Sequence, residues 1–222
     1  MRRFDRAAWT AIFIFTSGAA FGGDAAKDNG VDTGPVNAVW VDHDLSFTST
    51  GFTSHYSCSG LESKVEYVLK ALGARPGYKV NANGCTSSGP ELMPRVRIRA
   101  ALPMAATPEV LGEIESARAK GELAARAGGK PVTATDAATA QFPATWRVVK
   151  FEGTSMSNVQ DGDCELMEQL LDRVLKPMGV REVKGSALNC VPNQISMNAV
   201  SLKVRVLAAP PADASAKAPA LR

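Results

Sequence analysis

Four cysteines are the residues of this chain whose spacing most directly suggests chemistry. Cys58 follows Trp40, and Cys164 follows Trp146, at the same spacing of 18 residues, and each cysteine precedes an apolar helical stretch. A thiol at the start of a helix favours the thiolate form and can take part in disulfide exchange. The chain has no Cys-x-x-Cys motif. We therefore expect structural disulfides, and the alternative is a small periplasmic enzyme, for which thiol–disulfide exchange is one candidate activity.

This spacing belongs to an internal repeat, which also predicts how the cysteines pair. A second cysteine closes each copy, Cys85 in the first and Cys190 in the second. Four cysteines allow three pairings. The repeat selects Cys58 with Cys85 and Cys164 with Cys190. Each bridge would close a loop of about 27 residues and stabilise the fold by roughly 3 kcal/mol.

The other polar residues form no catalytic constellation. His43 and His55 are the only histidines, and Asp42 and Asp44 alternate with His43 along a predicted strand, so they point to the opposite face. We expect His43 to be a hydrogen-bonded inward residue and His55 a loop residue, with no metal site. The chain has no nucleophile-elbow, phosphate-loop or dinucleotide-binding motif, so it predicts no catalytic residue and no cofactor.

Basic residues on the outer face of the predicted sheet remain as candidates for binding. A sheet that carries helices on one face presents the other face to solvent or to a partner. These residues could hold an anionic envelope component, such as a phosphorylated glycolipid or a polysaccharide, or another periplasmic protein. The alternative is a solvated face on which acidic neighbours pair with them. The candidate residues are Lys79, Arg95, Arg97, Arg99, Lys203 and Arg205.

Periodicity predicts the elements that position the first two cysteines. Alternating residues predict a strand over 40–47, and apolar residues at helical spacing predict a helix over 61–72 that ends at Gly73. Further strands are predicted over 78–85 and 95–99.

The second copy predicts the same order. A strand over 146–152 precedes a helix capped by Asp163, and strands over 182–187 and 202–207 follow. We predict an α+β fold of two βαββ repeats, with the helices packed on one face of antiparallel or mixed sheet and one disulfide per repeat. The sequence leaves open whether the halves share one sheet.

A long insert separates the two halves. Thr107-Pro108-Glu109 predicts a helix start, and the helix should run to about Ala127. Its apolar stripe is thin, and Gly112 and Gly121 weaken it. We expect this helix to lie on the surface or to bridge the halves.

The N-terminus is typical of a secretory signal peptide that is cleaved near Gly22/Gly23. Three arginines precede an apolar run that is too short to span a membrane, and an uncleaved anchor is the alternative. We expect a periplasmic or secreted protein with no transmembrane segment in the mature chain. The predicted organisation is a signal peptide (1–22), a flexible leader (23–38), the first half (39–103), a helical insert and linker (104–145), the second half (146–208) and a disordered tail (209–222).

The mature chain is nearly neutral. The whole sequence has a formal net charge of +3. Without residues 1–22, which carry three arginines and one aspartate, 22 basic and 21 acidic residues leave +1. Long-range attraction to nucleic acid is therefore not expected, and the predicted face also lacks aromatic platforms for stacking bases.

Three phrases of the chain resemble a family of exported, periplasmic proteins of Gram-negative bacteria with duplicated, cysteine-containing βαββ halves. They are Tyr56-Ser57-Cys58-Ser59-Gly60-Leu61, Phe142-Pro143-Ala144 and Gly162-Asp163-Cys164-Glu165-Leu166. The resemblance covers roughly residues 40–208. It implies a periplasmic location and the duplicated layout, but no function and no catalytic residue. We expect a non-enzymatic binding or envelope-associated protein.

Overall fold

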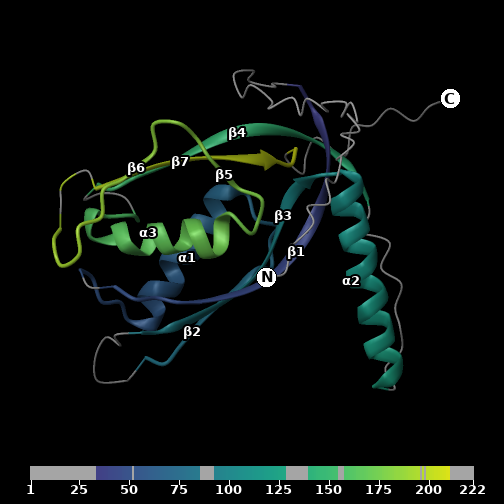
Figure 1. Ribbon diagram of the computed structural model, residues 1–222, viewed down its shortest axis with the longest axis horizontal. Coiled ribbons are helices and arrows are strands. Elements are labelled where there is room, and N and C mark those ends of the chain that lie inside the picture. The colour runs from purple at the N-terminus through teal and green to yellow at the C-terminus, as the bar shows by residue number, and fades with distance from the viewer. Residues whose placement is uncertain are drawn as a thin grey trace, which may run out of the picture. The chain divides into compact units, whose positions relative to one another are not determined.

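A computed structural model of the protein shows an antiparallel sheet with two helices packed on one face, which confirms the predicted α+β class (Figure 1). It describes residues 34–51, 53–85, 93–128, 140–154, 158–195, 197 and 199–210. The seven strands follow the order β2-β3-β1-β4-β7-β5, and β6 also pairs with β7. The predicted signal peptide, most of the predicted leader and the predicted tail beyond residue 210 lie outside the described residues.

The first half consists of β1 (Val36–Thr48), α1 (Cys58–Leu72), β2 (Lys79–Asn83) and β3 (Arg95–Ala105). The Ser57 side chain caps α1 by accepting a hydrogen bond from the Gly60 amide. The helix ends at Gly73, whose φ of 82° lies in the left-handed region. The predicted apolar stripe is confirmed, because all its side chains are buried: Leu61, Val65, Val68, Leu69 and Leu72.

The second half has the same order but is more broken. It consists of β4 (Phe142–Glu152), a 3₁₀ turn η2 (Asp161–Asp163), α3 (Cys164–Leu170), a π-helical turn η3 (Leu171–Leu175), β5 (Arg181–Glu182), β6 (Ala187–Leu188) and β7 (Val200–Ala208). The helix widens after Leu170, where the Lys176 amide donates to the Leu171 carbonyl. The predicted stripe is buried through this change: Met167, Leu170, Leu171, Val174, Leu175 and Met178.

A continuous strand was predicted over 182–187, and its continuity is wrong, because only its two ends belong to strands. Gly185 has a φ of 83°, which turns the chain and separates β5 from β6. The Ser186 hydroxyl makes hydrogen bonds to the backbone between β5 and β6. It lies 2.9 Å from the Val183 carbonyl oxygen and accepts the Lys203 amide at 3.0 Å. The alternating residues therefore belong to a turn and not to a continuous strand. The Ser186 hydroxyl takes the place of backbone groups as the hydrogen-bond partner of Val183 and Lys203.

The two halves share one sheet and one core, which the sequence left open. β1 and β4 pair only where Val36–Ala38 lies beside Phe142–Ala144. We call β1, β2 and β3 the first wing of the sheet, and β4 to β7 the second wing. Figure 1 shows α1 and α3 lying between the wings. A single apolar cluster takes residues from both helices and both wings, so burial of a common core holds the halves together.

The insert forms α2 (Pro108–Ala127), which begins as predicted. The Thr107 hydroxyl accepts a hydrogen bond from the Val110 amide at 3.4 Å, and Pro108 occupies the first turn. No residue of α2 is buried, so the helix lies on the surface and outside the core. None of the helices in the described part of the chain is long and apolar enough to cross a membrane.

Two predicted side-chain roles need correction. Asp163 precedes α3, but its carboxylate makes no cap hydrogen bond to that helix. His43 points inward, but its buried Nε2 has no hydrogen-bond partner among the described residues, so the expected hydrogen bond is absent there. Burial lowers the His43 pKa, although nearby Asp42 acts in the opposite direction. His55 is an exposed loop residue, as predicted.

Candidate functional site

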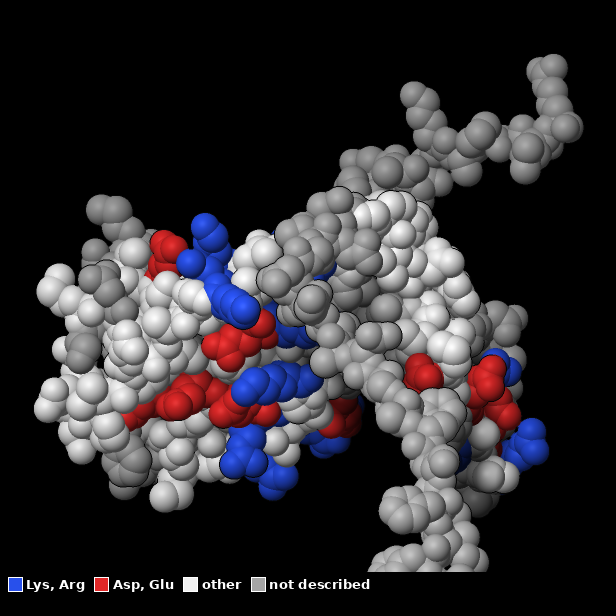
Figure 2. Space-filling view, turned by 45° about the horizontal axis from the view of Figure 1, so that its top comes forward, with Lys and Arg blue, Asp and Glu red and all other residues white. Residues whose placement is uncertain are grey.

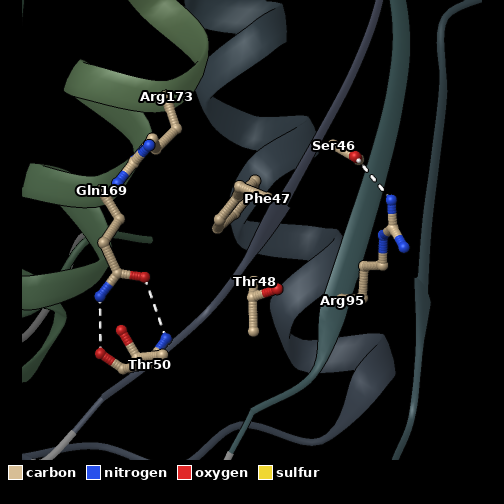
Figure 3. Close-up of a pocket in the computed structure, with 7 residues that line it drawn as sticks. All are labelled: Ser46, Phe47, Thr48, Thr50, Arg95, Gln169 and Arg173. Carbon is tan, nitrogen blue, oxygen red and sulfur yellow. Dashed lines mark hydrogen bonds between the residues drawn. The ribbon is translucent and has the colours of Figure 1, made fainter.

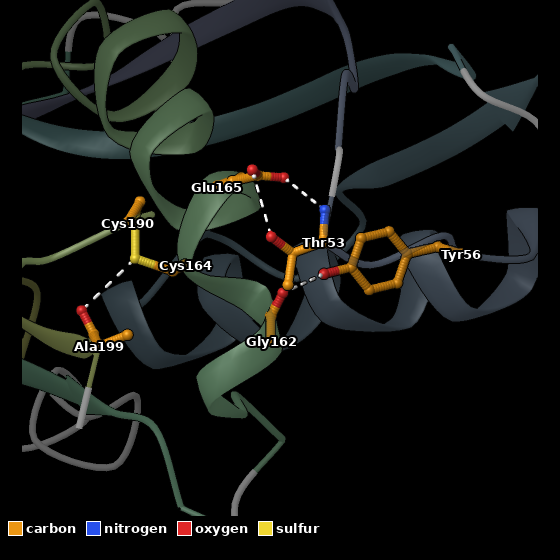
Figure 4. Close-up of a disulfide and its surroundings, with 7 residues drawn as sticks. All are labelled: Thr53, Tyr56, Gly162, Cys164, Glu165, Cys190 and Ala199. Carbon is orange, nitrogen blue, oxygen red and sulfur yellow. Dashed lines mark hydrogen bonds between the residues drawn. A yellow bond between two sulfur atoms is a disulfide. The ribbon is translucent and has the colours of Figure 1, made fainter. Parts of the chain in front are cut away.

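Both predicted disulfides are present, and each joins a helix start to the chain that returns beside it. The Cα atoms of Cys58 and Cys85 lie 5.7 Å apart, and those of Cys164 and Cys190 lie 5.3 Å apart. Cys164 is only 5% exposed, and its Sγ lies 3.5 Å from the Ala199 carbonyl oxygen (Figure 4). A sulfur in a disulfide carries no proton, so this contact is packing. An incoming thiolate has little access to Cys164, which favours a structural role for the second bridge.

A buried carboxylate beside this bridge connects the two halves. Asp163 is 3% exposed. It accepts hydrogen bonds from the Tyr56 hydroxyl at 2.6 Å and from the Lys64 ammonium at 2.6 Å, both from the first half. The Gln160 amide donates to it at 2.7 Å. Burial and the Asp163 carboxylate raise the Tyr56 pKa, so the hydroxyl stays protonated and remains a donor.

A second set of contacts holds the loop after β1 against α3. The Glu165 carboxylate accepts the Thr53 amide at 3.1 Å and faces the Thr53 hydroxyl (Figure 4). One turn along the helix, the Gln169 side chain pairs with the Thr50 backbone in both directions, at 3.0 and 2.6 Å. The end of β1 and the exposed side of α3 are therefore held at a defined distance.

A pocket of about 460 Å³ lies at this junction. Its walls come from the end of β1, the start of β3 and the α3–η3 helix, so neither half forms it alone. Figure 3 shows Arg95 on the strand side and Arg173 and Gln169 on the helix side. The lining residues are Ser46, Phe47, Thr48, Thr50, Arg95, Gln169 and Arg173.

The chemistry of this lining suits an anion. It carries two guanidinium groups, three hydroxyls and a carboxamide, and no acidic side chain is among its lining residues. Arg95 is oriented by a 3.2 Å hydrogen bond to the Ser46 hydroxyl, which uses only part of its donor capacity. Guanidinium groups bind carboxylate and phosphate oxygens in a bidentate way, and adjacent hydroxyls can complete the coordination.

The predicted basic residues are distributed over both wings, and only Arg95 reaches the pocket. Arg97 and Arg99 lie on the outer face of β3 and both bind Asp44, at 2.7 and 3.1 Å. The hydrogen bond from Arg97 is the main reason that the Asp44 pKa falls to about 2. Lys79 lies opposite Arg99 on the edge strand β2. The contacts with Asp44 favour the solvated interpretation for Arg97 and Arg99.

Two arginines of the second wing contact an aromatic ring. Arg205 lies 5.0 Å and Arg181 5.7 Å from the centre of the Trp146 ring. Lys203 lies on the same strand as Arg205, nearer to the β5–β6 turn. On the face that Figure 2 displays, acidic and basic side chains are interspersed and form no continuous basic patch.

Two smaller hollows are less suited to an anion. One, of about 320 Å³, is lined by His43 and mixes Asp42 and Asp44 with arginines. The other, of about 240 Å³, contains Lys64, whose ammonium is already bound to Asp163. No group of three His, Cys, Asp or Glu side chains in the described ranges is placed to hold a metal ion.

Sequence reasoning missed Arg173 and the role of Asp163. Arg173 stands on the polar side of a helix, where the sequence does not distinguish it from other solvated residues. The sequence signal for Arg173 was its position four residues after Gln169, which places the two side chains on the same side of the helix. Asp163 is part of a phrase that carries the family resemblance, but its contacts with Tyr56 and Lys64 depend on how the halves pack.

Comparisons of the chain with models of known protein families, with curated proteins and with solved structures give no match.

Proposed function

We propose that the protein is an exported, non-catalytic binding protein that holds an anionic group in the pocket between its two halves. The pocket lined by Arg95 and Arg173, with hydroxyls and no acidic lining residue, is the observation that carries this proposal. Two disulfides and the predicted signal peptide support work outside the cytoplasm. The anionic group would belong to an envelope component, such as a phosphorylated glycolipid or polysaccharide, or to another periplasmic protein.

Titration calorimetry with small phosphate esters tests the proposal. Glucose 1-phosphate and inorganic phosphate should bind to the mature protein, and glucose should not, because it lacks the charge that the guanidinium groups recognise. Arg173→Gln and Arg95→Gln should each weaken binding by about tenfold or more, since a hydrogen bond to a charged group contributes roughly 1.5–3 kcal/mol. Lys150→Gln, which removes an exposed charge from β4, is the matched control.

Equal affinity for wild type and for both arginine variants would exclude this pocket as the binding site. Absence of binding by either phosphate compound, with a folded protein, would exclude a small phosphate as the recognised group. Raising the salt concentration should weaken binding, because part of the attraction is screened.

The alternative is a small thiol–disulfide active enzyme, favoured by the position of each bridge at a helix start. Reduction potentials below about −300 mV for both bridges would show that they resist reduction and are structural. A higher potential for Cys58–Cys85, together with reduction of a model disulfide substrate, would favour the enzyme.

A further inference from the structure

The helix α2 has an apolar face with no partner in the described chain. No residue of the helix is buried; on its apolar face Ala117 and Gly121 are exposed, and Val110 and Ile114 are half-buried. A Cβ added at Gly112 or Gly121 would meet nothing within 4 Å. A glycine inside a helix is about 1 kcal/mol less favourable than alanine, and helices gain most of their stability from packing one face. The helix therefore bears two weakening residues without the packing that normally offsets them.

The apolar face is asymmetric along the helix. With 3.6 residues per turn, Val110, Ile114, Ala117, Gly121 and Ala124 lie along one side. The larger side chains are in the N-terminal half, and the C-terminal half offers only small residues. Two copies of this face fit together in antiparallel orientation, because the bulky half of one then lies against the small half of the other.

The charges of α2 have the same asymmetry. The N-terminal half carries Glu109, Glu113 and Glu115, and the C-terminal half carries Arg118, Lys120 and Arg126. Glu122, the acidic residue of the second half, is bound by Arg118 at 3.0 Å and by Arg126 at 3.9 Å. Glu113 and Lys120 flank the apolar side on the same edge, and neither forms a salt bridge within the described residues.

We infer that α2 is the docking face for a second copy of this chain, which binds by an antiparallel α2–α2 pair centred near Ala117. This register places Ile114 opposite Gly121 of the partner subunit and Val110 opposite Ala124 of the partner subunit. It also places Glu113 beside Lys120 of the partner subunit, and the two-fold axis repeats each contact. Gly121 allows the helices to approach closely. The interface uses no residue of the proposed anion pocket, so a negative result for one proposal leaves the other unaffected.

Sedimentation velocity on the mature protein tests this interface. A single helix pair is a small interface, so we expect a monomer–dimer equilibrium between micromolar and submillimolar concentrations. Gly121→Leu should abolish the dimer, because the new side chain fills the space that the partner helix needs. Gly112→Leu makes the same change on the opposite side of α2 and should leave the dimer intact. Both substitutions improve helix propensity, so loss of helix cannot explain a difference.

A charge exchange tests the orientation. Glu113→Lys and Lys120→Glu should each weaken the dimer by roughly tenfold, because each turns two attractive contacts into repulsive ones. The double variant E113K/K120E restores both pairs in reversed sense and should regain most of the affinity. In addition, Ala117→Cys should cross-link two copies under mild oxidation, and Ala119→Cys, on the far side of the helix, should not.

A monomer over the whole concentration range would overturn the inference. A dimer that survives Gly121→Leu and ignores both charge variants would also overturn it, because association would then use another surface.

Discussion

The buried pair between Lys64 and Asp163 makes a quantitative prediction for Lys64→Met. Loss of one partner from a buried ion pair usually destabilises a protein by about 3–5 kcal/mol. Here the Lys64 side chain is 21% exposed and Asp163 keeps its bonds to Tyr56 and Gln160, so water and two donors reduce the effect. We expect a loss of about 2–3 kcal/mol, or a fall of about 5–10 °C in Tm. Urea unfolding followed by circular dichroism, with both disulfides intact, measures it.

Lys176→Met is the matched control, because Lys176 and Asp172 form an exposed lysine–aspartate pair with side chains 52% and 53% exposed. Its stability should stay close to that of the wild type. If Lys64→Met were no more destabilising than this control, the Asp163 network would not hold the halves together. Tyr56→Phe combined with Lys64→Met completes a double-mutant cycle. A coupling energy near zero would show that the two donors do not act together on the Asp163 carboxylate.

Three further predictions concern stability. Cys85→Ser should lower the free energy of unfolding by about 3 kcal/mol, because the unfolded chain is then no longer constrained by the Cys58–Cys85 loop. Calorimetry should show no such difference between this variant and wild type in which the disulfides are already reduced. Because burial lowers the His43 pKa, the unfolded chain binds more protons as pH falls through about 6.5, so stability should decline between pH 7 and pH 5. His43→Leu should flatten that decline in urea titrations, and an unchanged slope would assign it to other groups. Gly179→Ala should destabilise by about 1–2 kcal/mol, because Gly179 has a φ of 76° that alanine adopts poorly, whereas Gly112→Ala should stabilise slightly in the same thermal assay.

Local signals predicted most of the elements. The stripe from Leu61 to Leu72 and the glycine at position 73 determined α1, because helix burial and termination depend on residues within a few turns. The continuous strand predicted over 182–187 is wrong for a related reason. Alternation cannot distinguish a ladder from a turn in which Gly185 reverses the chain and Ser186 supplies the missing hydrogen bonds.

The candidate site was predicted only in part. Arg95 was identified because it alternates with buried residues on a strand, but Arg97 and Arg99 were grouped with it although both are bound by Asp44 outside the pocket. Arg173 was missed, since its place opposite Arg95 depends on how the α3–η3 helix lies against the end of β1.

The sequence by itself determined the α+β class, the two disulfides and the position where α1 ends. These features depend on periodicity and on spacings that occur twice in one chain. Only the tertiary structure decided that the halves share a core, that Asp163 receives Tyr56 and Lys64 from the other half, and that two arginines line one pocket. The physical reason is that each of these contacts joins residues far apart in the chain. Their meeting follows from how two amphipathic helices and two sheet wings bury a common apolar surface, which no local pattern specifies.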